Sequence, residues 1–126
     1  MRYLVILLFS VALFSCDPVH NLTLNNQSGN AIEVLYRPSL DDIPTDGIQI
    51  EKEEIQGQQL DKITLDSAEI LRIGRVTAMY TPTADDVELD YLEIRNGQDT
   101  IRLTGKRAIL STIQKIESLD WRLVVK

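Results

Sequence analysis

The chain has 126 residues, with 13 Lys and Arg, 19 Asp and Glu, and a formal net charge of −6 at pH 7. This length fits a single domain, and the acidic balance disfavours a nucleic-acid partner, because phosphate binding requires a basic face. Cys16 is the only cysteine, so an intrachain disulfide is excluded.

The N-terminal segment predicts export. Arg2 supplies one positive charge, and residues 3–14 form an apolar run in which Ser10 is the only clearly polar residue. Such a run is too short for a bilayer core, which needs about 20 apolar residues. It matches the hydrophobic region of a secretory signal, with the small residue Ser15 at the cleavage position. We therefore expect residues 1–15 to be removed.

Leu13-Phe14-Ser15-Cys16 resembles the lipobox read by the bacterial lipoprotein signal peptidase, although a smaller residue is commoner at the position of Phe14. The resemblance implies that the Cys16 thiol is diacylated, that the chain is cut just before it, and that the new amine is acylated. Two or more acyl chains hold a protein firmly on a membrane. The alternative is a secreted or cytosolic protein with a buried N-terminal helix and an incidental cysteine.

The expected organisation is a signal peptide at 1–15, a lipid anchor and short spacer at 16–21, and one β-rich domain at 22–126. Lipid on Cys16 would leave no thiol for a metal or a nucleophile. Asp17 resembles an inner-membrane retention signal of enterobacteria, but that rule does not hold in every phylum. We expect the outer rather than the inner membrane, with the domain facing the periplasm or the cell surface.

Alternating apolar residues at 22–24 and 32–36 predict two strands, separated by a segment dense in turn residues at 25–30. Pro38 is expected to end the second strand, and residues 39–47 read as a solvated loop. Further short strands are predicted at 48–50 and 63–65, on either side of the polar segment 51–59.

A longer strand is predicted over residues 70–79 with Gly74 inside it, which indicates a bulge or a close backbone approach. A hairpin is expected around Asn96-Gly97-Gln98-Asp99. A two-residue Asn-Gly turn would set Ile94 opposite Asp99, whereas a four-residue loop sets Ile94 opposite Ile101. Because cross-strand pairs contribute about 0.2–1 kcal/mol each, the second register is predicted. It also pairs Leu92 with Leu103 and Glu93 with Arg102.

The last part of the chain predicts a helix and a strand. Ile109, Leu110, Ile113 and Ile116 recur at helical spacing within residues 106–119. Residues 121–125 then alternate as a final strand. The predicted fold is mainly β: a small β-sandwich-like domain of about seven to eight strands with one late amphipathic helix.

Candidate chemistry is sparse. His20 is the only histidine and follows closely on the anchor, where partners in a fixed geometry are not expected. Asp41-Asp42 and Asp85-Asp86 are chain neighbours in predicted loops, whereas a glycosidase needs two separated carboxylates in a cleft. We expect no cofactor and no enzymatic activity, with a carboxylate-based hydrolase as the residual alternative.

Asp42-Ile43-Pro44-Thr45-Asp46-Gly47, together with Glu53, resembles an EF-hand loop at its first, fifth, sixth and twelfth positions. Pro44 offers no side-chain oxygen at the third position, and no helices are predicted on either side. Asp42, Asp46 and Glu53 are thus the calcium candidates, but a solvated loop without metal is the expected structure.

Trp121 is in phase with Leu123 and Val125, so we expect burial rather than an exposed sugar platform. Asp66-Ser67-Ala68 and Asp99-Thr100-Ile101 resemble the three-residue O-glycosylation motif of Bacteroidota. The chain as a whole resembles the small lipoproteins common in that phylum, whose sandwich domains open with an Asn-rich first hairpin.

The expected function is that of a membrane-anchored, non-enzymatic binding or accessory module at the cell envelope, with a protein or glycan partner. The alternative is a periplasmic inhibitor or immunity-type lipoprotein that acts on a cationic enzyme through the acidic loops. Acidic residues dominate the first part of the mature chain, whereas residues 100–126 hold six basic and two acidic residues.

Overall fold

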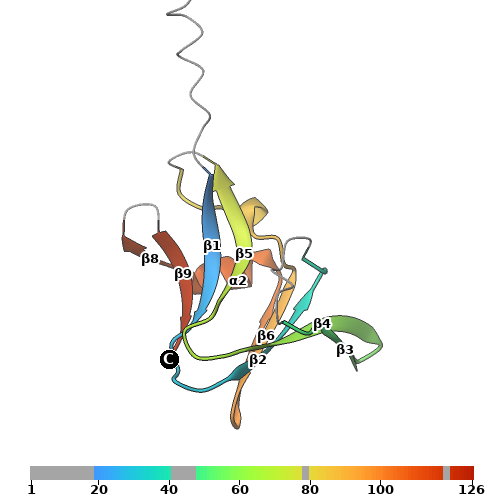
Figure 1. Cartoon of the computed structure of the whole chain (residues 1–126). Coiled ribbons are helices and arrows are strands. Elements are labelled where there is room, and N and C mark those ends of the chain that lie inside the picture. Colours follow the sequence, from blue (N-terminus) through green and yellow to red (C-terminus); the bar gives the residue numbers. More distant parts are fainter. Residues whose placement is uncertain (1–18, 41–47, 78–79, 118–119) are drawn as a thin grey trace, which may run out of the picture.

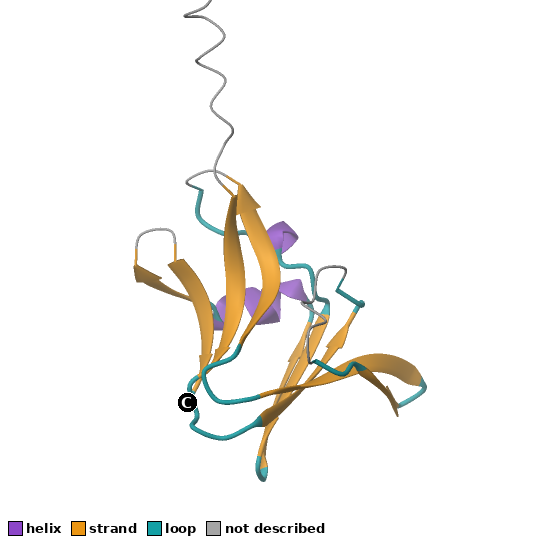
Figure 2. Cartoon of the chain, viewed as in Figure 1, coloured by secondary structure: helices purple, strands orange, loops and turns teal. Residues whose placement is uncertain are grey.

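The computed structural model describes residues 19–40, 48–77, 80–117 and 120–126. The predicted signal peptide, Cys16, and the loop with Asp41, Asp42 and Asp46 lie outside these residues. The described chain is mainly β, with two sheets and a short late helix (Figure 2), so the predicted fold class is confirmed.

The first sheet has four strands in the order β5-β1-β9-β8 (Figure 1). Their bounds are Val19–Asn26 for β1, Ile70–Thr77 for β5, Gln114–Glu117 for β8 and Asp120–Val125 for β9. β1 and β9 are parallel, with Leu22 beside Trp121 and Asn26 beside Val125. The start of β1 and the C-terminus therefore lie at opposite ends of this sheet. Residues 19–21, predicted as spacer, are the first residues of β1.

The second sheet has five strands in the order β3-β4-β2-β6-β7. Their bounds are Ile32–Arg37 for β2, Glu51–Ile55 for β3, Gln58–Leu65 for β4, Tyr91–Asn96 for β6 and Asp99–Thr104 for β7. All neighbouring pairs are antiparallel. Since β1 and β2 belong to different sheets, the Asn-rich segment between them links the two layers and is not the hairpin that the Bacteroidota resemblance implied.

Apolar side chains from the inner faces of both sheets form one core, which includes Leu22, Leu24, Val34, Ile73 and Ile94. The helix α2 (Lys106–Thr112) contributes the fully buried Ile109 and contacts β6, β7 and the 3₁₀ turn η1 (Ala84–Asp86). Within the part of the chain that the structure describes, no helix has the length and apolar character needed to cross a membrane.

Gly74 lies at an irregularity of β5, and both features predicted for it, a bulge and a close backbone approach, are confirmed. The β1–β5 register shifts between Leu22, which pairs with Gly74, and Thr23, which pairs with Arg72. Gly74 also forms a bridge with Val87, and a Cβ at this position would overlap the carbonyl oxygen of Asp86. The chain after β5 can therefore fold back directly against the strand only because residue 74 has no side chain.

The predicted strand register of the β6–β7 hairpin is confirmed, with Ile94 opposite Ile101 and Glu93 opposite Arg102. The predicted loop of four residues is wrong, because Asn96 and Asp99 pair with each other and only Gly97 and Gln98 form the turn. The positive φ of Gly97 (61°) suits a tight turn of this length.

The predicted boundaries of the strands on either side of residues 51–59 are wrong. The polar segment 51–59 does not separate two strands but makes most of the β3–β4 hairpin, where residues 51–55 pair with 58–62. The backbone explains this, since Gln56 and Gly57 both adopt the positive φ that a two-residue hairpin turn requires. Charged residues also suit an exposed edge strand, because they oppose pairing with another chain.

The late helix ends at Thr112 instead of extending to residue 119. The hydroxyls of Ser111 and Thr112 donate to the carbonyls of Ala108 and Ile109, and Ile113 is already extended (φ −79°, ψ 128°). Residues 114–117 then form the edge strand β8 against β9. Pairing with the last strand thus overrides the helical spacing of the apolar residues.

Candidate functional site

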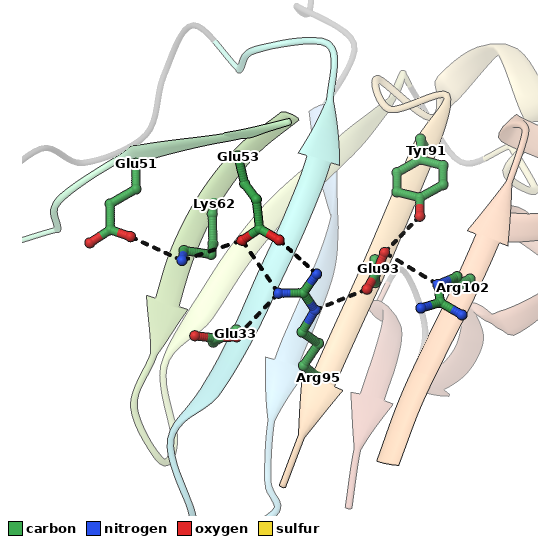
Figure 3. Close-up of polar contacts among 8 residues, drawn as sticks. All are labelled: Glu33, Glu51, Glu53, Lys62, Tyr91, Glu93, Arg95 and Arg102. Atoms are coloured by element: carbon green, nitrogen blue, oxygen red, sulfur yellow. Dashed lines mark hydrogen bonds and ion pairs between the residues drawn. The ribbon is translucent and has the colours of Figure 1, made fainter. Parts of the chain in front are cut away.

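The outer face of the five-stranded sheet carries a network of charged side chains. Alternate residues of β2 and β6, such as Val34 and Ile94, point into the core, so Glu33, Glu93 and Arg95 lie on the outer face. Figure 3 shows that residues from all five strands meet there. We call the following set the charged network: Glu33, Glu51, Glu53, Lys62, Tyr91, Glu93, Arg95 and Arg102.

Glu93 is the centre of the network, and its side chain is 0% exposed although it lies on an outer face. The hydroxyl of Tyr91 donates to Glu93 Oε2 at 2.7 Å, and Arg95 Nε donates to Glu93 Oε1 at 2.9 Å. Arg102 Nε lies 3.4 Å from Oε2. A buried carboxylate is tolerated when it is paired and hydrogen-bonded in this way.

These contacts set the ionisation of Glu93. Burial raises the pKa of the Glu93 carboxyl, but the hydrogen bonds from Tyr91 and Arg95 and the charges of Arg95 and Arg102 outweigh burial, so the pKa lies below its ordinary value. The same environment raises the pKa of the Tyr91 hydroxyl, through burial and through its hydrogen bond to Glu93. At neutral pH the network therefore holds Glu93 as an anion.

Arg95 connects the middle of the sheet to its edge. Its two terminal nitrogens donate to the two carboxylate oxygens of Glu53 at 2.9 and 3.3 Å, a bidentate pair. Glu53 is on β3 and Arg95 on β6, with β4 and β2 between them. The pair therefore spans three strand-to-strand steps and ties the β3–β4 hairpin to the centre of the outer face. Glu33 Oε2, on β2, lies 3.6 Å from the same guanidinium.

Lys62 completes the network at the edge. Its Nζ lies 3.1 Å from Glu51 Oε2 and 3.4 Å from Glu53 Oε2. Hydrogen bonds to Glu51 and Glu53 raise the pKa of Lys62. The hydrogen bond from Arg95, with smaller contributions from Lys62, lowers the pKa of Glu53. Glu53 and Lys62 are thus held in their charged forms at neutral pH.

A polar pocket of about 280 Å³ adjoins the network and shares Glu51 and Lys62 with it. Among the residues that line it, three carry carboxylates (Glu51, Asp66 and Glu69), and only Lys62 carries a positive charge. The lining residues are Ile48, Gln49, Glu51, Lys62, Thr64, Asp66 and Glu69. Its side chains offer hydrogen-bond donors and acceptors to a polar ligand.

The residues proposed from sequence as calcium ligands are only partly described. Glu53 lies in the charged network, where it binds Arg95 and Lys62, while Asp42 and Asp46 lie outside the described residues. In the described ranges, no group of three or more His, Cys, Asp or Glu side chains is arranged to hold a metal ion.

The other residues considered from sequence are placed in separate parts of the fold. His20 is half-buried on β1 opposite Val76. Asp86 accepts hydrogen bonds from the backbone N and the hydroxyl of Thr83 and so caps η1. Trp121 is only half-buried against the core, less than expected, and Lys115 Nζ lies 5.7 Å from its ring centroid.

The two motifs that resemble O-glycosylation sites also lie apart. Ser67 is exposed in the turn that joins β4 to β5, and Thr100 is exposed on the edge strand β7. The charged network was not predicted from sequence, apart from the pair of Glu93 and Arg102. Its signal was present in the charged residues at alternate positions of β6, but their partners come from strands distant in sequence.

Comparisons of this chain with protein-family models, with curated proteins and with solved structures found no match.

Proposed function

We propose that the chain is a bacterial envelope lipoprotein, anchored through Cys16, whose β-sandwich is a non-enzymatic binding module. The ligand surface is the polar pocket together with the adjoining edge of the charged network. The observation that carries this proposal is the pocket itself, whose Glu51 and Lys62 are held by the same ion pairs that order the outer face.

The ionisation of the network favours binding over acid–base catalysis. A carboxyl group that acts as a general acid needs a raised pKa, so that it still holds a proton near neutral pH. Glu53 and Glu93 both have lowered pKa values and remain ionised. Fixed charges of this kind select a ligand by complementary charge and hydrogen bonding.

The pocket suits a glycan or a polar protein segment. Gln49 and Thr64 can hydrogen-bond to hydroxyl groups, while the carboxylates accept hydrogen bonds from hydroxyls or amines. A second candidate function is that of an inhibitor or immunity protein against a cationic enzyme. It is favoured by the three carboxylates in the pocket, which would attract a lysine or arginine side chain of such an enzyme.

Binding by the full-length lipidated protein, purified in detergent, tests this proposal. Glycan arrays and pull-downs from envelope extract would be compared for the native chain, Glu51→Gln and Glu54→Gln. Glu54 is a matched control, because it is exposed on the same strand but opposite Gln59, on the other face of the hairpin. Loss of binding in Glu51→Gln with retention in Glu54→Gln supports the pocket.

Salt distinguishes the two candidate functions. Capture of one basic protein that is lost at high salt supports the inhibitor, because screening weakens contacts between exposed charges. Glycan binding that persists at high salt supports the carbohydrate module. Equal binding by the native chain and Glu51→Gln would contradict the assignment of the pocket.

A further inference from the structure

The first strand begins very close to the predicted anchor. Val19 is three residues after Cys16, and an extended chain spans at most about 3.6 Å per residue, so Val19 can lie no more than about 11 Å from the lipidated residue. A lipid on Cys16 therefore leaves the domain no long tether. One end of the sandwich, the end at which β1 begins, must stay next to the membrane.

Three of the exposed apolar or aromatic side chains that the structure describes lie at this end, which we call the β1-start end. Val19 is 57% exposed and pairs with Thr77, the last residue of β5, and Tyr80, three residues further on, is 74% exposed. Ile116, 45% exposed, lies on β8 beside the residues that pair with the start of β9. Since Trp121 of β9 is level with Leu22 of β1 and pairs with Lys115 of β8, the start of β9 and the end of β8 lie towards this same end (Figure 1).

The chemistry of these side chains fits the interface of a bilayer. Tyrosine and tryptophan are enriched at the level of the lipid headgroups, where a ring can be partly apolar and partly wet. Lys115, which lies over the ring of the half-buried Trp121, can bury its methylenes while its charge stays among the headgroups. Val19 and Ile116 add apolar surface that water would otherwise cover.

We propose that the β1-start end seats directly on the membrane surface through Val19, Tyr80 and Ile116, as a non-covalent contact in addition to the lipid. This inference rests on the proposed lipidation of Cys16. It fixes the orientation of the domain, because the strands of the first sheet then run away from the bilayer. The pocket residues Asp66 and Glu69, which adjoin Asn26 at the far end of β1, face away from the membrane.

Two matched reporters test the orientation. Trp121 is the only tryptophan, so a Trp121→Phe background allows a single tryptophan at Tyr80→Trp or at Ile70→Trp. Ile70 is a suitable control because it is 58% exposed but pairs with Asn25, at the opposite end of the first sheet. The full chain, acylated by a bacterial host, would be reconstituted into phospholipid vesicles that carry a nitroxide on the lipid headgroup.

We expect the position-80 reporter to be quenched several-fold more strongly than the position-70 reporter. A second test keeps Trp121 as the reporter and so does not depend on how Trp121→Phe folds. Here Ile116→Asp should lower the quenching of Trp121, whereas Ile70→Asp should leave it unchanged. Protein that floats with the vesicles but shows equal quenching at both positions, or no effect of Ile116→Asp, overturns the inference and leaves the anchor intact. Protein that carries no lipid and does not float overturns the proposed anchor as well.

Discussion

Glu93 on β6 lies directly opposite Arg102 on β7, and Arg102 Nε is 3.4 Å from Glu93 Oε2. Tyr91 and Arg95 donate hydrogen bonds to the same carboxylate, which has no solvent exposure. A buried carboxylate on the outer face of a sheet is costly unless all its partners are present. The order of the outer face therefore depends on Glu93.

Glu93→Gln tests this dependence. The substitution keeps the shape of the side chain but removes the charge that three neighbours share, and hydrogen bonds to charged groups contribute about 1.5–3 kcal/mol. We expect a loss of this size in the free energy of unfolding, measured by urea denaturation. Glu54→Gln, which removes one exposed carboxylate from β3, should stay within about 0.5 kcal/mol of the native value. Equal stability of the two variants would contradict a central role for Glu93.

The same carboxylate predicts an acid dependence of stability. Because the folded-state pKa of Glu93 is lowered, its contribution is fully present above the unfolded value of about 4.5 and is lost as the pH falls through the lower folded value. Urea midpoints of the native chain should therefore fall as the pH drops below 4.5. Glu93→Gln should lose less stability over the same range, and parallel pH profiles would argue against the assignment.

Gly74→Ala tests the close approach between β5 and η1. The new Cβ would overlap the carbonyl oxygen of Asp86, which belongs to the backbone and cannot rotate away. Overpacking in a tight site costs about 1–3 kcal/mol, and we expect a loss in this range by urea denaturation. Thr77→Ala, at the exposed end of the same strand, is the control and should be nearly neutral. A neutral Gly74→Ala would mean that the chain after β5 moves away without cost.

Asn26→Asp tests the link between the two sheets. The Asn26 side chain is fully buried and its Nδ2 donates to the carbonyls of Asn30, Leu65 and Asp66. Aspartate has the same shape but no donor, so the buried hydrogen bond to the Leu65 carbonyl is lost, and a buried group left unsatisfied costs about 1–3 kcal/mol. We expect a loss in this range in the free energy of unfolding. Asn30→Asp adds the same charge at an exposed position and should have little effect.

The sequence predicted those features of the fold that depend on local pattern. Strict alternation identified β2 and the last strand. Cross-strand pairing identified the β6–β7 register, because it sets Ile94 opposite Ile101 instead of opposite Asp99. Gly74 was recognised because a glycine inside a strand leaves few explanations. In each of these cases the signal lies within a few residues of the feature.

The remaining features depend on contacts between distant segments. The helix ends at Thr112 because residues 114–117 pair with β9. The helical spacing of apolar residues does not show that strand pairing competes with the helix there. The β3–β4 hairpin is polar because it is an edge, which the segment itself does not reveal. The charged network joins Glu53 to Arg95, which are 42 residues apart in the chain. A single sequence gives no direct sign of such a pair.

Mass spectrometry of the N-terminal peptide from the membrane fraction decides whether Cys16 is lipidated. We expect a mature chain that begins at Cys16 and carries acyl groups on the thiol and the new amine. Cys16→Ala should accumulate as an unprocessed precursor. A full-length chain with an unmodified Cys16, recovered from the soluble fraction, would show that the protein is not anchored by lipid.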